Sequence, residues 1–378
     1  MLYLDAAATT PVRREVLEAM WPYLTGDFGN PSSQNALGFS AATGLTTARR
    51  VVAARLGVRA SEVVFTSGGT EADNLAIKGI ALGDPRGRHL IVSAIEHEAV
   101  LESARFLQRL HGFEVNMLPV DAVGMVSASS LAAALRPDTT LVSIMYANNE
   151  IGTVQPITEL AAIARAAGVP FHTDAVQAAG WLPLDLGVLG VDALSLSGHK
   201  LGAPKGVGVL AARSRVPLEP LVHGGGQERG IRSGTENVAG AVALARAIEL
   251  SVDPDAAGTS RRRDRLIAGV LAAVPDSELT GHPTARLPGH ASFVFPGTSG
   301  ESLLLELEQR GVVSSSGSAC AAGSDEPSSV LLALGIAPGI AQTAVRFSFG
   351  VDLSDDDVEV VIAAVAASVA AVRALAPR

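Results

Sequence analysis

Two of the chain's three lysines, Lys200 and Lys205, stand in a single loop rich in glycine and proline, SLSGHKLGAPKG at residues 195–206. Lys200 follows an apolar run that is typical of a buried strand, so its side chain is expected to start at the carboxyl end of that strand. The other basic residues are nearly all arginines, which stay protonated, whereas a desolvated lysine can lose its proton and become a nucleophile. The pattern favours amine chemistry at Lys200, with a solvated loop charge as the alternative, and an ordinary role for Lys205.

The obvious use of such an amine is a Schiff base with pyridoxal phosphate (PLP), and the sequence offers the other parts that this cofactor needs. TSGGTEADN (66–74) supplies glycines and Thr70 at a helix start, where backbone N–H groups can bind a phosphate. Asp174, at the end of VPFHTD, could pair with the pyridine nitrogen, and Gln177 could donate to the ring oxygen. His97, in AIEHEAV, could stack on the ring face. Each residue alone also fits a cap or an ordinary polar side chain, but together they indicate a PLP site.

Cys320 is the only cysteine and lies among serines, glycines and alanines in SSSGSACAAGS (314–324). That composition predicts an exposed loop and a nucleophilic thiol, with a buried small hydrophobe as the alternative. A single cysteine excludes an intramolecular disulfide and a metal site made of several cysteines, so no standing metal site is expected. Arg346, in AVRFSFG (344–350), could hold a substrate carboxylate with a two-pronged contact or be a surface strand arginine.

Seven short apolar runs alternate with helical stretches, which predicts an α/β fold with a mainly parallel sheet covered on both faces by helices. In such sheets ligands bind beyond the carboxyl ends of the strands, and most of the candidate residues fall there. The runs are VVFT (63–66), HLIVSA (89–94), EVNMLPV (114–120), TLVSIMY (140–146), VPFHTD (169–174), DALSLS (192–197) and GVGVLAA (206–212).

A second, smaller unit is expected after the large sheet, because 378 residues exceed the usual size of one core. A helical stretch over 234–250 is followed by VDPDAAGTS (252–260), which is typical of a hinge. Beyond it, SFVFP (292–296) and AVRFSFG predict strands of a smaller α/β unit that also carries the Cys320 loop.

The bulk composition argues against several classes of partner. The net charge is −9, the pI is about 5.4 and aromatic residues make up 4% of the chain, so no direct nucleic acid or anionic membrane surface is expected as a partner. MLYLDAAATTP is not typical of a signal peptide. The apolar tract VVIAAVAASVAAV (360–372) is shorter than the roughly 20 residues that a bilayer needs, so a packing helix and a cytoplasmic location are expected.

An ordered set of motifs across nearly the whole chain resembles the cysteine desulfurases of the NifS/IscS type, in the aminotransferase class V branch of the fold-type I PLP enzymes. The resemblance implies a homodimer with active sites near the subunit interface. It also implies a large PLP-binding domain over 13–252 and a small domain over 1–12 and 253–378. The motifs are LDAAATTP, GNPSS, TSGGTEADN, EHEAV, NNEIGTVQP, HTDAVQ, SLSGHKLGAPKG, HGGGQERGIRSGT, SSGSAC and VRFSFG.

The resemblance assigns a role to each matched residue. Lys200 looks like the PLP lysine, His97 like the stacking histidine and acid/base, and Cys320 like the sulfur acceptor. Asp174 and Gln177 look like the partners of the ring nitrogen and the ring oxygen. The remaining residues look like ligands of the phosphate (Gly69, Thr70, Ser197, His199 and, from the other subunit, Thr235), a contact near the ring and substrate (Asn149) and the carboxylate clamp (Arg346).

The implied reaction removes sulfur from L-cysteine, giving L-alanine and a persulfide on Cys320. The sulfur would then pass to an acceptor protein, in iron–sulfur cluster assembly or in thiolation of tRNA or cofactors. Cys320 could also contact a nascent iron–sulfur cluster transiently. The alternatives are a selenocysteine lyase, a related class V aminotransferase, or a non-catalytic sulfur carrier with the same fold.

The chain departs from the family pattern in two places. After GNPSS the family commonly carries a histidine, whereas Gln34 and Asn35 follow here. The sequence also ends at RALAPR, without the extension that some relatives use to bind the iron–sulfur scaffold. Docking by such a tail is therefore not expected, and the sulfur acceptor stays open.

Overall fold

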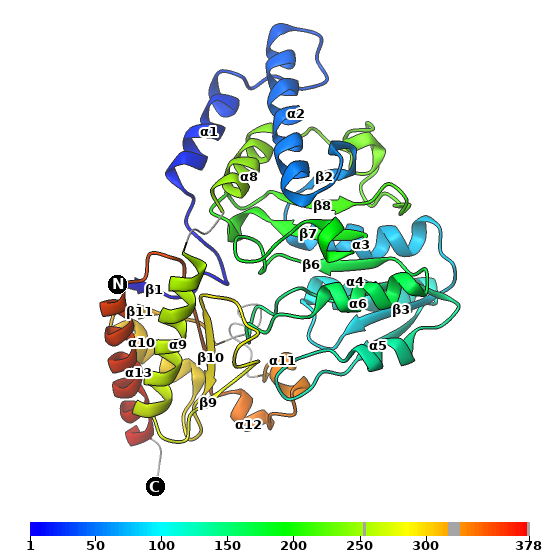
Figure 1. Ribbon diagram of the computed structural model, residues 1–378. Helices are drawn as coiled ribbons and strands as arrows, with labels where there is room; N and C mark the ends of the chain where they lie inside the picture. The colour runs from blue at the N-terminus through cyan, green and yellow to red at the C-terminus, as the bar shows by residue number, and fades with distance from the viewer. Residues whose placement is uncertain (252–254, 317–325, 376–378) are drawn as a thin grey trace.

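The computed structural model describes residues 1–251, 255–316 and 326–375. Its larger part is built on a seven-stranded sheet (Figure 1), which confirms the sheet predicted from the sequence. From one edge to the other the strands are β2 (Val63–Thr66), β8 (Gly208–Ala212), β7 (Ala193–Ser197), β6 (Phe171–Asp174), β5 (Thr139–Ser143), β3 (His89–Ser93) and β4 (Glu114–Leu118).

Only β8 runs against its neighbours, pairing antiparallel with both β2 and β7. The reason is the short connection after β7, which contains the 3₁₀ helix η2 (Gly198–Lys200) and leaves no room for the crossover helix that a parallel pair requires. The chain order reverses between β3 and β5, and this reversal opens a crevice at the carboxyl edge of the sheet.

Helices cover both faces of this sheet, and side chains alternate between the two cores. In β2, Val64 packs with one core, whereas Val63 and Phe65 pack with the other. The first core lies under α3 (Gly69–Gly83) and α4 (Glu98–His111). The second lies under α2 (Ala36–Leu56), α5 (Ala128–Ala134), α6 (Ile157–Ala166), α7 (Leu186–Leu189) and α8 (Val238–Leu250).

Short elements complete the larger part. The helix α1 (Arg14–Thr25) packs against α8 beside α2. Two 3₁₀ helices, η1 (Ala60–Glu62) and η3 (Glu228–Gly230), lie in the connections before β2 and before α8.

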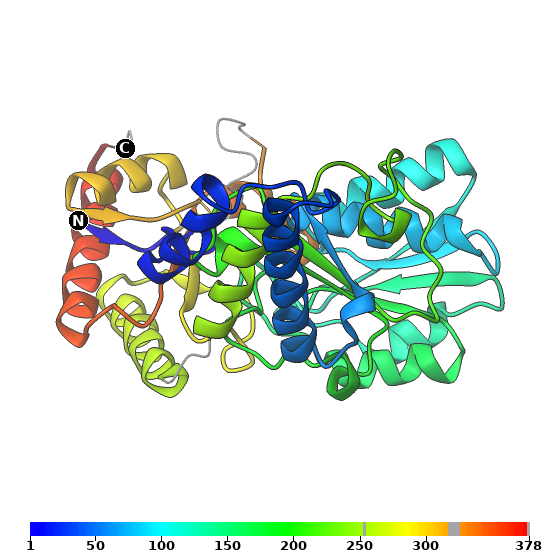
Figure 2. The same ribbon diagram turned by 90° about the horizontal axis from the view of Figure 1, so that it is seen from above.

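The smaller part lies at one end of the molecule, together with both chain termini (Figure 2). Its antiparallel sheet has the order β12 (Ala344–Ser348), β10 (His290–Val294) and β9 (Glu278–Leu279), and β1 (Leu2–Tyr3) pairs in parallel with β11 (Val312–Val313). The core of this part includes Leu4 as well as residues between 266 and 372. Its helices are α9 (Ala256–Ala273), α10 (Gly300–Gln309), α11 (Ser329–Ala333), α12 (Pro338–Ala341) and α13 (Asp355–Leu375).

The N-terminal residues therefore pack with the C-terminal third, which supports the proposed division into 13–252 and 1–12 with 253–378. The boundaries themselves stay a prediction. A bridge between Asp5 and Ser348 joins the N-terminal segment to β12, with the backbone N–H of Ala7 donating to Ser348 Oγ at 2.8 Å, and the chain then crosses to the larger part.

The helix α13 is longer than the apolar tract seen in the sequence. It has 21 residues and a mean hydropathy of 2.1 over its most apolar stretch, so by length and composition alone it could cross a membrane. In the structure, however, Val361, Val365 and Val369 are buried in the smaller core, and α13 packs against α9 and α10. This packing agrees with the expected packing helix.

Candidate active site

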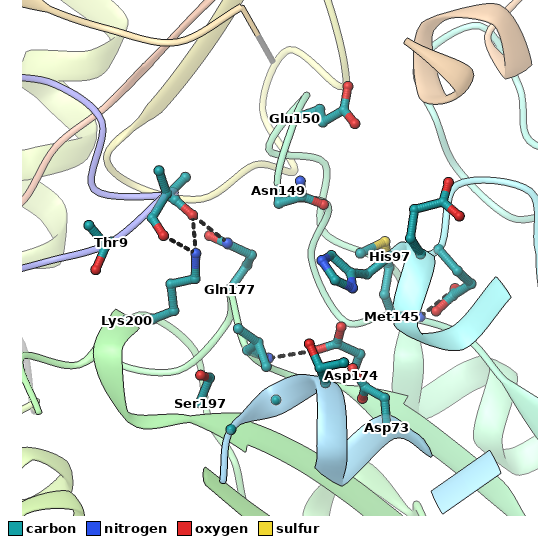
Figure 3. Close-up of a pocket in the computed structure, with 18 of the residues that line it drawn as sticks. Thr9, Asp73, His97, Met145, Asn149, Glu150, Asp174, Gln177, Ser197 and Lys200 are labelled. Carbon is teal, nitrogen blue, oxygen red and sulfur yellow. Dashed lines mark hydrogen bonds between the residues drawn. The ribbon is translucent and has the colours of Figure 1, made fainter. Parts of the chain in front are cut away.

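A cavity of about 920 Å³ lies at the carboxyl edge of the seven-stranded sheet (Figure 3). Its walls come from the loops after β3, β5, β6 and β7, from the first turns of α3, from β12 and from the N-terminal segment. Of the predicted site residues that the structure describes, all but Thr235 line it: Gly69, Thr70, His97, Asn149, Asp174, Gln177, Ser197, His199, Lys200 and Arg346.

Lys200 ends the 3₁₀ helix that directly follows β7, as the strand-end argument predicted. Its Nζ donates hydrogen bonds to the carbonyl oxygens of Ala7 at 2.5 Å and Ala8 at 2.6 Å. Gln177 Nε2 donates to the same Ala7 oxygen at 3.0 Å. The N-terminal segment thus fixes both the amine and the amide on one wall of the cavity.

Asp174 is the last residue of β6, and its carboxyl group lies at the floor of the cavity with 5% of the residue exposed. Its Oδ1 accepts a hydrogen bond from the backbone N–H of Val176 at 2.8 Å. Burial raises the pKa of Asp174, while electrostatic interaction with His97, the hydrogen bond from Val176 and the charge of Lys200 lower it. A buried acceptor in this position suits a ring N–H that carries positive charge.

His97 stands across the cavity from Lys200, at the N-cap of α4 (Figure 3). Its Nδ1 accepts a hydrogen bond from the backbone N–H of Ala99 at 3.1 Å. Because Nδ1 is the acceptor, the proton of the neutral imidazole belongs on Nε2. The cap therefore fixes both the orientation and the tautomer of the ring.

The first turn of α3 approaches the end of β7 closely at Gly69. A Cβ at this position would lie 2.9 Å from Val176 Cγ2 and 3.3 Å from Ser197 Cβ, whereas a Cβ on Gly68 would meet nothing within 4 Å. Of these two positions, only position 69 therefore requires a glycine for the close approach of α3 to the end of β7. With Thr70 and Ser197 beside it, this helix start is a site for an anionic group such as phosphate.

His199 borders the same end of the cavity as a neutral imidazole. Burial, together with the charges of Lys200 and Lys205, lowers the pKa of His199 to about 4. Its Nδ1 lies 3.1 Å from Thr9 Oγ1, which ties the ring to the N-terminal segment. A neutral ring in this place can still donate one hydrogen bond to an anion.

Arg346 reaches the cavity from β12 of the smaller part, and its side chain is fully buried. Its Nη1 donates to the carbonyl oxygen of Asn149 at 2.9 Å, and its Nη2 to Asp5 Oδ1 at 2.6 Å. His290 Nε2 donates to the same Asn149 oxygen at 3.1 Å. These contacts hold the guanidinium in one orientation, which suits recognition of a carboxylate.

Among the predicted residues that the structure describes, Thr235 does not line this cavity. Thr235 is exposed in the connection between η3 and α8, as a residue offered to another subunit would be. Its neighbour Arg232 pairs with Glu71 at the cavity rim, with Nε and Oε1 2.8 Å apart. Cys320 lies outside the described residues. The roles of Thr235 and Cys320 therefore stay predictions.

Gln34 and Asn35, which follow GNPSS where the family commonly has a histidine, do not line the cavity. Asn35 is the N-cap of α2, where its Oδ1 accepts the backbone N–H of Gly38 at 2.9 Å. Gln34 is exposed, and neither residue lines the cavity.

The N-terminal segment was missed as part of the site by reasoning from residue types. Asp5 contacts Arg346, and Thr9 contacts His199. The carbonyl oxygen of Ala7 accepts hydrogen bonds from Lys200 and Gln177, and that of Ala8 accepts one from Lys200. Two of these residues act through backbone carbonyls, which every residue carries, so their types gave no chemical signal. The motif LDAAATTP was noted only through the resemblance.

Buried carboxyl groups of the cavity were missed as well. Glu96 Oε1 accepts Ser93 Oγ–H at 2.5 Å and the backbone N–H of Met145 at 2.8 Å. Burial raises the pKa of Glu96 to about 8, despite these hydrogen bonds. Its place beside His97 in EHEAV was the signal that could have found it.

Glu150 and Asp73 complete the acidic lining. Glu150 Oε2 accepts Ser328 Oγ–H at 2.5 Å, and burial raises the pKa of Glu150. Asp73 lies one helical turn after Gly69, on the same face of α3. That spacing in TSGGTEADN could have identified it.

The residues present fit PLP. The close approach at Gly69 makes an anion cradle at one end of the cavity, and the buried Asp174 carboxyl lies at its floor. The Lys200 amine lies on another wall of the same cavity. The cavity thus offers an anion site for the phosphate, a carboxyl group for the ring nitrogen and an amine for the aldehyde carbon.

Comparison with known proteins agrees with this geometry. The sequence profile of the family described as "Aminotransferase class-V" matches residues 2–361. The chain is 48% identical to "Cysteine desulfurase IscS" of Methanosarcina thermophila over 380 residues, covering 100% of this chain and 94% of the relative. A solved structure titled "NIFS-LIKE PROTEIN" has a TM-score of 0.90 and 37% identity, covering 98% of this chain and 99% of its own. Another, "SspA in complex with cysteine", has a TM-score of 0.82 and 37% identity, covering 92% and 99%.

Proposed function

Because this chain belongs to the class V aminotransferase family and is a PLP-dependent cysteine desulfurase, we propose that the residues gathered in its cavity carry out each part of that reaction. The observation that carries the proposal is the shared cavity of Lys200 and Asp174. An amine and a buried carboxyl on the walls of one anion-binding cavity are the two groups that PLP chemistry requires.

When bound, PLP supplies an aldehyde that takes up the substrate amine and a ring that accepts electrons from the substrate Cα. Asp174 would accept a hydrogen bond from the ring nitrogen and favour its protonated form. Gln177, which shares the Ala7 carbonyl oxygen with Lys200, would donate to the ring oxygen. Gly69, Thr70, Ser197 and His199 would hold the phosphate at the start of α3.

Lys200 and His97 handle protons on opposite sides of the cavity. Lys200 Nζ, held by two backbone carbonyls, takes the proton from the substrate Cα. His97 carries its proton on Nε2, which supports proton donation during the later protonation of the product.

The substrate is L-cysteine, and its carboxylate binds at Arg346 beside Asn149. A structure with cysteine is known for the neighbour titled "SspA in complex with cysteine", which supports this assignment. The Cys320 thiolate attacks the substrate sulfur, and the carbon–sulfur bond breaks with its electrons remaining on carbon. Protonation of that carbon yields alanine, and Cys320 keeps the sulfur as a persulfide.

Mass spectrometry of the Cys320 peptide after incubation with cysteine, beside an alanine assay, tests the proposal. One added sulfur atom on that peptide, with alanine formed in step, is the expected result. Cys320→Ala should keep PLP and lose sulfur transfer. Full sulfide release from Cys320→Ala, or alanine formed from pyruvate at a comparable rate, would indicate the selenocysteine lyase or aminotransferase alternative.

We also propose that the enzyme is a homodimer. The exposed apolar side chains Leu17, Trp21, Leu24 and Phe28 follow one another at helical spacing along α1 and just beyond it. They form a stripe next to the helix face that carries the buried Val16 and Met20. A stripe of this kind on a water-soluble surface supports a second copy of the chain as its cover.

Sedimentation equilibrium of Trp21→Glu tests the dimer. We expect the variant to dissociate at concentrations where the parent chain is dimeric, while Leu305→Glu, at an exposed position on α10, should not. The acceptor protein, its docking mode, the cytoplasmic location and any transient cluster contact at Cys320 stay predictions.

A further inference from the structure

His290 is a buried histidine next to the part of the cavity wall that Asn149 and Arg346 form. It is the first residue of β10 in the smaller sheet, where it pairs with Ser348 of β12, and only 2% of the residue is exposed. Asn149 lines the cavity from the loop after β5 in the larger part (Figure 3). His290 therefore lies where the two parts meet at the site, and none of the steps proposed above uses it.

His290 contacts this loop through the carbonyl oxygen of Asn149. Its Nε2 donates to that oxygen at 3.1 Å, and Arg346 Nη1 donates to the same oxygen at 2.9 Å. A carbonyl oxygen has two lone pairs, so these two donors use its full capacity. The imidazole and the guanidinium, from neighbouring strands of the smaller sheet, thus share one acceptor in the larger part.

The Nδ1 side of the imidazole lies against Gly152. A Cβ at this glycine would lie 2.6 Å from His290 Nδ1 and 2.8 Å from Cγ, and its φ of +75° also favours glycine. Among the residues that the structure describes, none makes a hydrogen bond with Nδ1. The ring is therefore held by packing on one side and by the hydrogen bond of Nε2 on the other.

A neutral ring with its proton on Nε2 is the form that fits this place. Because the acceptor is a carbonyl oxygen, Nε2 must carry the proton. Burial, and then the charge of Arg346, lower the pKa of His290 to about 3, although the hydrogen bond with Asn149 opposes the shift. The nearby charges of Arg286 and Arg263 also lower this pKa. His290 is thus a neutral donor with one fixed tautomer.

Backbone contacts hold the loop further along, beyond Asn149. The backbone N–H of Leu287 donates to the carbonyl oxygen of Gly152 at 2.9 Å, and the backbone N–H of Val154 donates to that of Ala285 at 2.9 Å. These contacts begin three residues after Asn149, so they leave its own carbonyl to the side chains from the smaller sheet. The position of the Asn149 peptide group therefore depends on those side chains.

We propose that His290 is a positioning residue for the substrate carboxylate: its Nε2–H fixes the Asn149 carbonyl that anchors Arg346, and so sets the direction of the guanidinium. The inference rests on the proposed function, because it takes Arg346 as the group that binds the carboxylate of L-cysteine. Without this donor, the Asn149 carbonyl would keep Arg346 as its partner but could turn with it. The loss should fall on carboxylate recognition, because the groups proposed to hold the phosphate, the ring nitrogen and the aldehyde carbon come from the larger part.

Two amide variants separate the hydrogen bond from the packing of the ring. The amide nitrogen of glutamine is as many bonds from Cα as Nε2 of histidine, whereas that of asparagine matches Nδ1. In His290→Asn, the KM for L-cysteine should rise about tenfold, the equivalent of one lost hydrogen bond, with kcat within about twofold of the parent. His290→Gln should restore the KM to within about twofold of the parent. Equal KM values in the two variants, or a loss that appears in kcat alone, would overturn the proposal.

A pair of ligands shows whether the effect passes through the carboxylate. L-Alanine and L-alaninamide differ in this group, and their binding to the PLP-loaded enzyme can be followed by absorbance. His290→Asn should weaken the binding of L-alanine about tenfold and leave that of L-alaninamide unchanged. Equal weakening of both ligands would contradict the proposal, because general damage to packing has that effect.

Nitrogen-15 NMR of the imidazole rings gives a readout that does not depend on activity. The parent minus His290→Gln spectrum at pH 7 should contain a neutral ring with its proton on Nε2. A proton on Nδ1, or a charged ring, would rule out the proposed donor even if His290→Asn fails to fold. The proposed function fails separately, through a parent enzyme that forms no alanine from L-cysteine or an Arg346→Lys variant that keeps the parent's KM.

Discussion

Replacing Glu96 by glutamine should stabilise the protein increasingly as the pH rises. Glu96 is 4% exposed, and burial raises the pKa of its carboxyl from the ordinary 4.5 to about 8. Between these two values the folded chain binds a proton at Glu96 that the unfolded chain releases. The stability of the parent protein therefore falls with rising pH across this window.

The magnitude follows from the width of that window. Each pH unit between the two pKa values costs about 1.4 kcal/mol, so the folded parent loses about 3 kcal/mol by pH 7 and about 5 kcal/mol above pH 8. Glutamine is neutral at every pH. Its oxygen can accept the hydrogen bonds of Ser93 and Met145 as Glu96 Oε1 does. Glu96→Gln should therefore match the parent at pH 4.5 and exceed it by these amounts at higher pH.

Urea unfolding of the cofactor-free protein at pH 5, 7 and 9 measures the difference. Glu98→Gln is the matched control, because Glu98 is half-exposed two residues away and its ion pair with Arg105 spans 3.5 Å at the surface. We expect the control to change stability by less than about 1 kcal/mol at any pH. Parallel pH curves for Glu96→Gln and the parent would refute a carboxyl held neutral by burial.

Three further predictions concern the cavity. Lys200→Ala should lose the visible absorbance of the bound cofactor and all alanine formation, and retention of that absorbance after gel filtration would contradict the assignment. Gly69→Ala should weaken PLP binding by about tenfold, because its Cβ would lie 2.9 Å from Val176 Cγ2, while Gly68→Ala has open space and should bind as the parent does in the same titration. Asp5→Asn should raise the KM for cysteine by about tenfold and lower the melting temperature, because it leaves the buried Arg346 guanidinium without its anion. An unchanged KM would show that Asp5 does not orient the clamp.

The sequence was most informative where side chains meet a ligand beyond a strand end. Asp174 ends the strand FHTD and Lys200 comes shortly after the strand ALSLS, and the parallel topology brings those ends to one edge. Residue type and strand position together were enough, because PLP needs an amine and a carboxyl. The same reasoning placed His97 after β3, and the structure adds that it caps α4 through Nδ1.

The parts that escaped prediction act through the backbone or through burial. Ala7 and Ala8 hold Lys200 with carbonyl oxygens, which no residue type reveals. Asp73 and Glu96 matter because the fold excludes water from them, and burial is a property of packing rather than of a motif. The two glycines of TSGGTEADN look equivalent in the sequence, yet only Gly69 is tightly packed.

The short N-terminal segment contacts both the Arg346 clamp and the Lys200 amine of the proposed site. Its Asp5 carboxylate holds the clamp on β12, and its Ala7 and Ala8 carbonyls hold the amine after β7. The single O–H of Tyr3 is shared between the carbonyl oxygens of Asp5 at 3.0 Å and Thr9 at 2.8 Å, which closes the segment into a compact turn. The clamp comes from the smaller sheet and the amine from the larger one, so this turn links the two sheets beside the contacts that Arg346 and His290 make with the carbonyl oxygen of Asn149. The relative position of the clamp and the lysine therefore depends on these hydrogen bonds as well as on the two sheets.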